Sequence, residues 1–274
     1  TEIPDANVPP YLSGLAANDP ARPAFEAAYL KATRPAHQRY NAFRRTRGLA
    51  ALPEGQFLET SPHLNLLLAP VAIRHERAAP LPADCFVFLD GCVRDEAQFE
   101  PPLLPVNDGP IVYMSFGSLG AIDTDLIRRL IGVFATLPAR FFVNVGGFLE
   151  SYQKVPDNVY LGSWFPQPSI VAQADLFIHH GGNNSYCEAL HFGIPSLVMP
   201  YCWDGHDNGL RAEQTGTGVH LERDTWTAQQ LSDTITSLVG DTRMLARMRK
   251  ISDAMKCGNG TRDAAQAILQ RVAV

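Results

Sequence analysis

The sequence is poor in basic residues, in closely spaced cysteines and in long apolar runs, and each shortage argues against a class of protein. Lys and Arg number 23 against 28 Asp and Glu, and the net charge of −5 disfavours nucleic acid or an anionic membrane as the main partner. The longest apolar run, 64–73, is about half of the roughly 20 residues that cross a bilayer, so no membrane span is predicted. The five cysteines form no CxxC pair, and their odd number indicates free thiols in a cytoplasmic protein.

The first residues contain no initiator Met, no basic segment and no apolar segment. They therefore match no signal peptide, and we expect the chain to begin within a longer protein. Its 274 residues exceed the usual single-domain size of roughly 100–200, so either one large domain or one domain plus part of another is expected.

The part before Pro110 predicts few regular elements. Apolar spacing over 22–47 predicts a helix, which Pro35 should kink or divide. Two apolar segments of strand length follow, at 64–70 and 85–91. The proline-rich stretch before Pro110 is typical of a domain linker.

After Pro110, continuous apolar strands alternate with helical segments. This pattern predicts a parallel sheet covered on both faces, the α/β doubly wound architecture. The expected strands are 111–116, 140–146, 159–164, 176–180, 196–200 and 219–221, and the expected helices are 123–136, 168–173, 184–191, 207–215, 227–239, 241–256 and 261–272. The domain prediction is a partial α/β domain at 1–95, a linker at 96–109 and a Rossmann-like domain at 110–274.

The expected strand 176–180 runs directly into two glycines and a helix that begins with Asn183, Asn184 and Ser185. In open α/β sheets, ligands bind beyond the carboxyl ends of the strands. Glycines let a backbone approach a ligand closely, and the free N–H groups of a helix start attract anions. A phosphate or diphosphate is the natural occupant.

Two ionisable residues flank this junction. His180 lies at the lip of the site, where it can donate a hydrogen bond to a phosphate oxygen. Glu188 lies on the same helical face as Asn184 and Ser185, and its carboxylate suits the vicinal hydroxyls of a ribose. The alternative is that Asn183 to Ser185 only cap a helix and that Glu188 is a solvated helix residue.

The run WFPQ…HHGGNNSYCEALHFGIPSLVMPYCWDGHDNG at 164–209 resembles the donor-binding signature of glycosyltransferase family 1, the nucleotide-sugar-dependent enzymes of the GT-B fold. The resemblance extends from about Ile111 to the C-terminus, and VYMSFGS at 112–118 matches the family's first strand and turn. It implies that 110–274 is the C-terminal domain of a GT-B fold. The residues before the linker would then be the closing part of the N-terminal, acceptor-binding domain.

The resemblance also implies roles for individual residues. Trp164 would stack on the nucleobase, with Gln167 near nucleobase and ribose, and Glu188 would bind the ribose hydroxyls, which favours UDP over a deoxyribose donor. The residues at the diphosphate would be Ser118, His180, Gly182, Asn184 and Ser185. Three of these positions keep an alternative interpretation: Trp164 as a core aromatic, Ser118 as a turn residue and His180 as a hydrogen-bonded strand-end histidine.

One departure from the family pattern concerns the sugar. The family places an acidic residue and a glutamine after the strand 196–200, followed three residues later by Asn-Ala. Here Asp204 and Asn208 match, but Gly205 replaces the amide. The sugar-binding residues implied are Asp204, Gly205, His206 and Asn208, and His206 or Asp207 could replace the missing contact.

Two motifs imitate metal sites. Asp123-Thr124-Asp125 has a metal-diphosphate form, but it stands at an expected helix start, where Asp caps the helix. Asp204, His206 and Asp207 lack a well-separated further ligand. We therefore predict no metal and no cofactor, with a UDP-sugar as co-substrate.

The implied reaction is metal-independent transfer of a hexosyl-type sugar to an acceptor hydroxyl with inversion. The family's catalytic base is a His near the start of the N-terminal domain, a region that we expect to be missing from this chain. His37, His63 and His75 are expected to be solvated or structural, so no catalytic residue is named. The expected partners are a nucleotide-sugar donor, a small-molecule acceptor and the missing N-terminal domain, in the same protein or in a second chain.

Two other functions stay open. The chain could be a nucleotide-sugar-binding module or subunit with no transfer activity on its own. A nucleotide-sugar epimerase of related fold explains the WFPQ segment at 164–167 less well.

Overall fold

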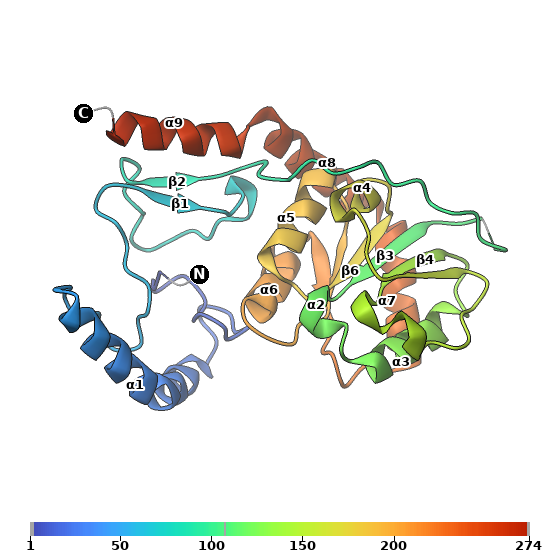
Figure 1. Ribbon diagram of the computed structural model, residues 1–274, viewed down its shortest axis with the longest axis horizontal. Helices are drawn as coiled ribbons and strands as arrows, with labels where there is room; N and C mark the ends of the chain where they lie inside the picture. The colour runs from blue at the N-terminus through green and yellow to red at the C-terminus, as the bar shows by residue number, and fades with distance from the viewer. Residues whose placement is uncertain (1–2, 107, 273–274) are drawn as a thin grey trace.

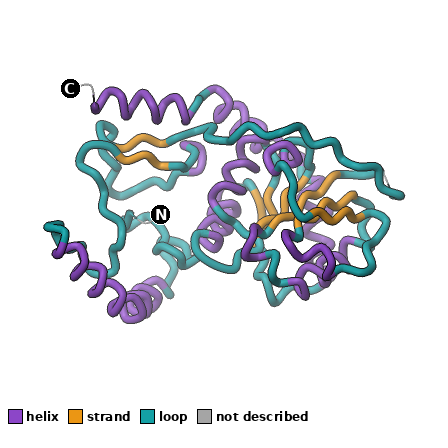
Figure 2. Tube along the Cα trace, viewed as in Figure 1, coloured by secondary structure: helices purple, strands orange, loops and turns teal. Residues whose placement is uncertain are grey.

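The computed structural model describes residues 3–106 and 108–272. The first two residues of the predicted domain 1–95, Asn107 of the predicted linker and the last two residues of the predicted domain 110–274 therefore lie outside the described residues. The chain forms two parts that lie side by side (Figures 1 and 2). Helix α1 and a two-stranded sheet make up the first part, and a six-stranded sheet with its helices makes up the second. Among these residues no helix has the length and apolar character to cross a membrane.

Helix α1 spans Arg22–Thr46 without interruption, so Pro35 does not divide it. A proline in a helix removes one backbone hydrogen bond and leaves the carbonyl four residues earlier unpaired. Pro35 and Lys31 are both exposed, so this carbonyl can be hydrated.

The two short strands predicted in the first part are present. Strands β1 (Asn65–Leu67) and β2 (Phe86–Phe88) pair in parallel, with Asn65 opposite Phe86, and a short 3-10 helix, η1 (Val71–Ile73), lies between them in the chain. The last helix, α9 (Gly260–Val272), returns from the second part and packs along β2 (Figure 1). The first part is thus held by both ends of the chain.

The second part is a six-stranded, wholly parallel sheet with the order β5-β4-β3-β6-β7-β8. The chain builds β3, β4 and β5 outward in one direction and then returns to place β6 on the other side of β3. The strand order therefore reverses between β3 and β6, where ligands bind in open α/β sheets. The strands are β3 (Ile111–Ser115), β4 (Arg140–Asn144), β5 (Val159–Gly162), β6 (Leu176–His179), β7 (Ser196–Val198) and β8 (Gly218–His220).

Two hydrophobic cores cover the two faces of this sheet. On β3, Val112 and Met114 pack in one core and Ile111 and Tyr113 in the other, because successive strand residues point to opposite faces. The predicted doubly wound architecture is confirmed. The helices of the second part are α3 (Thr124–Phe134), α4 (Gln167–Val171), α5 (Asn183–Phe192), α6 (Gly205–Thr215), α7 (Ala228–Gly240) and α8 (Thr242–Cys257).

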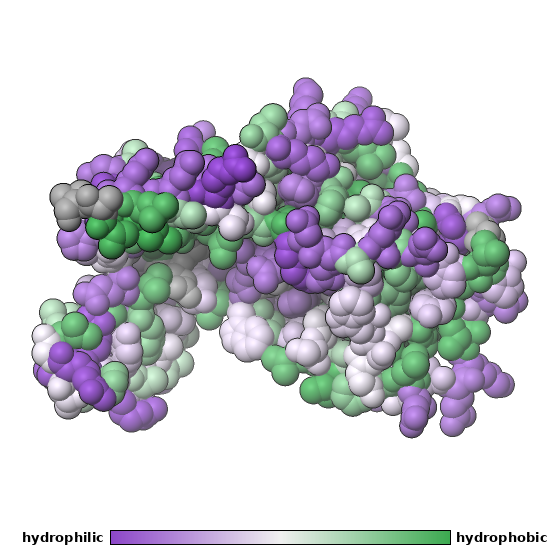
Figure 3. Space-filling model, turned by 45° about the horizontal axis from the view of Figure 1, so that its top comes forward, coloured by the Kyte–Doolittle hydropathy of each residue, from purple (hydrophilic) through white to green (hydrophobic). Residues whose placement is uncertain are grey.

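The sequence pattern missed two short elements that follow β3 and β4. A single helical turn, α2 (Gly117–Gly120), follows β3, and a 3-10 segment, η2 (Gly146–Ser151), follows β4. Both are too short to show a helical repeat. In the space-filling view the first part divides into two lobes with a recess between them, whereas the second part is a continuous mass (Figure 3).

Candidate functional site

The carboxyl ends of β3 and β6 lie together, with Ser115 opposite His179. The turns that follow them meet at the ring of His180. A Cβ on Gly117, whose φ is +69°, would lie 3.3 Å from His180 Cε1, and one on Gly182 would lie 2.5 Å from His180 Nε2. Glycine at Gly117 is therefore favoured by its backbone conformation, and a side chain at Gly182 would displace the His180 ring.

Burial lowers the pKa of His180, although the Asp204 carboxylate opposes this effect. The imidazole is therefore neutral near pH 7, and a neutral imidazole donates from one nitrogen. Its Nδ1 is buried with no hydrogen-bond partner among the described residues. The neighbouring His179 accepts a hydrogen bond from the Gly181 N–H at 3.0 Å, and burial lowers its pKa to about 3. His179 thus supports the turn, whereas the diphosphate role of His180 stays a prediction.

The first turn of α5 is braced from α6. Asp204 Oδ2 accepts a hydrogen bond from the Asn183 N–H at 2.9 Å and another from Asn208 Nδ2 at 3.1 Å. Asn208 Nδ2 also donates to the Gly181 carbonyl at 2.7 Å. These contacts give Asp204 and Asn208 a structural role in the turn, and their predicted sugar contacts stay untested. Asn184, the next residue of α5, is exposed at the helix start.

Gly205 departs from the family pattern for a steric reason. A Cβ at this position would lie 2.4 Å from the carbonyl oxygen of His180 and 3.2 Å from Pro200 Cβ. Because the start of α6 packs directly against the β6–α5 turn, no side chain fits at Gly205. The glutamine of the family pattern is therefore incompatible with this backbone.

Asp207 has a structural contact of its own, and the expectation that it replaces the missing amide stays a prediction. Its two carboxylate oxygens accept hydrogen bonds from the N–H groups of Leu12 and Gly14, at 2.8 and 2.9 Å. Burial raises the pKa of this carboxyl group. Asp207 thus fastens the N-terminal segment to α6. His206 is partly buried beside it, with its Cβ 3.1 Å from the Cβ position of Gly14.

A hydrogen-bond network lies at the predicted ribose position. Gln167 Nε2 donates to Glu188 Oε2 at 2.7 Å and to Ser185 Oγ at 3.2 Å. Arg94 Nη1 donates to Glu188 Oε1 at 2.9 Å. The Glu188 side chain is only 4% exposed, so the alternative of a solvated helix residue is wrong. Burial raises the pKa of Glu188, while the hydrogen bond from Gln167 and the charge of Arg94 act in the opposite direction.

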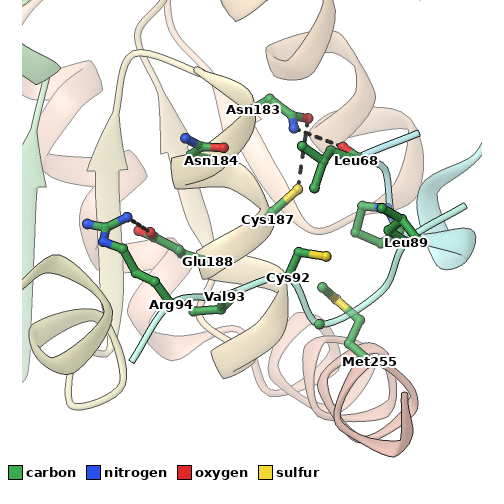
Figure 4. Close-up of a pocket in the computed structure, with 12 residues that line it drawn as sticks. Leu68, Leu89, Cys92, Val93, Arg94, Asn183, Asn184, Cys187, Glu188 and Met255 are labelled. Carbon is green, nitrogen blue, oxygen red and sulfur yellow. Dashed lines mark hydrogen bonds and ion pairs between the residues drawn. The ribbon is translucent and has the colours of Figure 1, made fainter. Parts of the chain in front are cut away.

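Glu188 and Arg94 border a pocket of about 180 Å³ between α5 and the segment after β2 (Figure 4). In the close-up their side chains meet at one side of the pocket, and Asn184 stands above Glu188 on the same helix. The pocket therefore joins the helix start to the buried carboxylate. The full lining is Leu68, Pro70, Leu89, Gly91, Cys92, Val93, Arg94, Asn183, Asn184, Cys187, Glu188 and Met255.

Trp164 and Ser118 face solvent. Trp164 lies between β5 and α4 and is 66% exposed, whereas its neighbour Phe165 is buried. The alternative of Trp164 as a core aromatic is therefore wrong, and its indole is free to stack. Ser118 is exposed in α2, beyond the end of β3.

The other sequence candidates have structural roles. Asp123 caps α3, because its Oδ1 accepts a hydrogen bond from the Leu126 N–H at 3.1 Å, so the capping prediction is confirmed. His37 is buried against Phe57 and lies 3.4 Å from Asn41 Nδ2. Burial lowers the pKa of His75 to about 4.

Sequence reasoning missed two arginines at this edge of the sheet. Arg94 comes from an irregular segment, and no local pattern links it to Glu188. Arg223 is buried over the rings of Phe116 and Tyr201, at 4.7 and 4.9 Å from their centroids. Arg223 follows the last strand, and its position after a strand end is the signal that could have found it.

Residues 132–270 match the family model described as the erythromycin biosynthesis protein CIII-like C-terminal domain. The chain belongs to this family. This result agrees with the resemblance to family 1 glycosyltransferases.

Curated relatives of the chain are glycosyltransferases. The NDP-glycosyltransferase YjiC of Bacillus subtilis is 27% identical over 243 residues, covering 87% of this chain and 61% of the relative. The oleandomycin glycosyltransferase of Streptomyces antibioticus is 28% identical over 235 residues, covering 85% of this chain and 54% of the relative. The chain thus spans little more than half the length of these relatives.

Solved structures share the fold. A glycosyltransferase of kitacinnamycin has a TM-score of 0.75 at 20% identity, covering 91% of this chain and 66% of that chain. The calicheamicin glycosyltransferase CalG4 has a TM-score of 0.70 at 22% identity, covering 87% of this chain and 60% of that chain. The two-part arrangement is therefore that of a GT-B fold.

Proposed function

We propose that this chain is the donor-binding portion of a glycosyltransferase that moves a hexosyl-type sugar from a UDP-sugar to a hydroxyl of a small-molecule acceptor, with inversion. The glycosyltransferase relatives support sugar transfer in general. The observation that carries the choice of nucleotide is the buried Glu188 carboxylate, which borders a pocket one turn below the start of α5. A carboxylate in that position suits the two hydroxyls of a ribose.

In this proposal the nucleotide lies along the edge where the strand order reverses. The exposed Trp164 stacks on the uracil, and Gln167 and Glu188 bind the ribose. The diphosphate lies at the start of α5, near His180 and the exposed Asn184. The helix N–H groups and a hydrogen bond from the neutral His180 stabilise the charge that develops on the leaving diphosphate.

A deoxythymidine nucleotide is the alternative donor. Two similar structures are a spinosyn rhamnosyltransferase complexed with thymidine diphosphate and a glycosyltransferase, VinC, in complex with dTDP. A deoxyribose lacks the 2′-hydroxyl and offers Glu188 one donor in place of two. Glu188 therefore favours UDP.

The remaining parts of the proposal concern the whole enzyme. The acceptor and the catalytic base would be provided by an N-terminal domain, in the same protein or in a second chain, and transfer would need no metal or cofactor and would take place in the cytoplasm. The alternative is a nucleotide-sugar-binding module without transfer activity. Both versions require that this chain binds the nucleotide.

Isothermal titration of the chain with UDP and with dTDP tests the proposal. We expect Glu188→Ala to weaken UDP binding by about 10- to 100-fold and dTDP binding much less, because it removes a charged acceptor of two hydroxyl hydrogen bonds. His180→Ala should weaken both nucleotides, because both carry the diphosphate. Asp233→Ala, an exposed site on α7, is the control. A wild-type chain without measurable UDP affinity would overturn the proposal.

A further inference from the structure

We propose that Arg94 is a positioning residue for ribose recognition, which holds the Glu188 carboxylate ionised and oriented toward the nucleotide pocket. This inference rests on the proposed function. It assigns a role to a side chain outside the 164–209 signature, on the segment that connects the two parts of the chain.

The contact between Arg94 and Glu188 joins an exposed group to a buried one. The Arg94 side chain is 53% exposed and lies on the irregular segment after β2, whereas the Glu188 side chain is 4% exposed on α5. Their atoms Nη1 and Oε1 are 2.9 Å apart. Arg94 also bonds Glu96 through its Nε, so the guanidinium is held at two points. The carboxylate of Glu188 therefore meets a cation whose orientation is fixed.

By the count of lone pairs, the same carboxylate has acceptor positions left for a ribose. An ionised carboxylate has about four acceptor positions on its two oxygens. Gln167 Nε2 uses one position on Oε2, and Arg94 Nη1 uses one on Oε1. One position remains on each oxygen, which matches two vicinal hydroxyl donors. Arg94 and a ribose can thus bind Glu188 together.

Ionisation of Glu188 depends on this partner. A buried carboxylate without a cation becomes protonated, because burial disfavours the charged form. Here burial raises the pKa of Glu188, and Arg94 lowers it against the further repulsion from Glu96. The other titratable groups close to Glu188 are the Cys187 thiol and the Tyr113 hydroxyl, whose pKa values are both raised. Arg94 is thus the cation that opposes protonation at Glu188.

Arg94 could instead contact the diphosphate directly, because it lines the same pocket as Asn184 at the start of α5. The two roles differ in one measurable way. Loss of a phosphate contact weakens the binding of ribonucleotides and deoxyribonucleotides equally. Loss of the contact that positions Glu188 weakens the binding of the nucleotide with a 2′-hydroxyl more than that of the 2′-deoxynucleotide.

The test is isothermal titration of the full chain with UDP and with 2′-deoxy-UDP. We expect Arg94→Ala to weaken the binding of UDP by about tenfold and the binding of 2′-deoxy-UDP by less than about threefold. Only UDP loses a charge-assisted hydrogen bond at the 2′-hydroxyl. Arg94→Lys should restore most of the preference for UDP. Arg249→Ala removes the same charge from an exposed position of α8 and should leave both affinities unchanged.

Two further measurements separate positioning from a purely structural role. In a Glu188→Gln background, Arg94→Ala should cause no further change in the UDP preference. The preference should also decline as pH falls through the pKa of Glu188, and in Arg94→Ala this decline should occur at higher pH.

Equal weakening of both nucleotides by Arg94→Ala would overturn the inference in favour of a phosphate contact. Unchanged affinities would overturn it in favour of a structural ion pair. If wild-type UDP binding is absent, the proposed function itself fails, and this inference fails with it. Circular dichroism and thermal unfolding of each variant exclude misfolding as the cause of a loss.

Discussion

The part of the chain after Pro110 buries its strands on both faces, whereas the part before it leaves most of its apolar side chains at least partly exposed. Of the described buried hydrophobic residues, only Val8, Ile73 and Leu89 precede Ile111. The first part also holds an apolar pocket of about 490 Å³ between the N-terminal segment, α1 and the loop 54–58. Burial of apolar surface is the main stabilising term in folding, so the second part should carry most of the stability.

The difference also shows how the parts are joined. Polar side chains around the candidate site hold backbone of the first part: Asp207 binds Leu12 and Gly14, and Asn183 Nδ2 donates to the Leu68 carbonyl at 2.8 Å. Arg94, on the segment that connects the two parts, donates a hydrogen bond to Glu188 of the second part. The first part is therefore placed by the edge of the sheet that bears the site.

The largest expected difference between the parts is in their response to the same core truncation. Phe141 is fully buried and stacks on Phe134 with centroids 4.2 Å apart, whereas Phe57 of the first part is 37% exposed. Phe141→Ala should lower the free energy of unfolding by about 3–5 kcal/mol, and Phe57→Ala by about 1 kcal/mol. Urea denaturation measures both. Similar losses of unfolding free energy for the two variants would contradict the view that the second part carries most of the stability.

Acid should weaken the second part through His179. Its pKa falls from 6.5 in the unfolded chain to about 3 in the folded chain because the ring is buried. The unfolded chain binds the proton first, so stability is lost as pH falls below 6.5. The expected loss is about 1.4 kcal/mol per pH unit down to about pH 3, in unfolding curves recorded at several pH values. His179→Asn should give a shallower slope, and an unchanged slope would contradict this origin.

Placing the glutamine of the family pattern at position 205 should disturb the packing of α6 against the β6–α5 turn. Gly205→Gln places a Cβ against the His180 carbonyl, so we expect a loss of about 1–3 kcal/mol in unfolding free energy and no gain in nucleotide-sugar affinity. Gly132→Ala is the matched control, because Gly132 lies inside α3 with open space around it, and it should stabilise by about 0.5–1 kcal/mol. A tolerated glutamine that tightens sugar binding would refute the steric explanation.

The smallest expected effect is local. Asp207→Ala removes the acceptor of the Leu12 and Gly14 amides. It should lower the free energy needed to detach the N-terminal segment from α6 by about 1–2 kcal/mol. Hydrogen exchange of these two amides should accelerate by about tenfold, while the amides of β3 and β6 keep their protection. Uniform acceleration across the sheet would show that the attachment also supports the second part.

The second part was predictable because its signals are local. Continuous apolar strands and glycine-rich strand ends follow from two- to six-residue patterns, and the predicted strand 176–180 contains β6. The prediction that Pro35 kinks or divides α1 is wrong for the division, because the pattern cannot show that the carbonyl left unpaired by Pro35 is open to solvent. Single turns such as α2 are too short to carry a period.

The candidate site was predictable only in part. The 164–209 signature contains Glu188, Gln167 and Trp164, and the structure joins the first two by a hydrogen bond and exposes the third. Their roles at the nucleotide stay predictions. Arg94 and the attachment through Asp207 were not predictable, because their partners lie 94 and 195 residues away in the sequence. The steric cause of Gly205 likewise depends on a tertiary contact with His180.

A crystal structure of the chain with UDP tests the central claim most directly. We predict uracil on the exposed face of Trp164, both ribose hydroxyls within hydrogen-bonding distance of Glu188, and the diphosphate at the start of α5. The claim would be contradicted if UDP bound elsewhere, for example in the apolar pocket beside α1, and made no contact with Glu188.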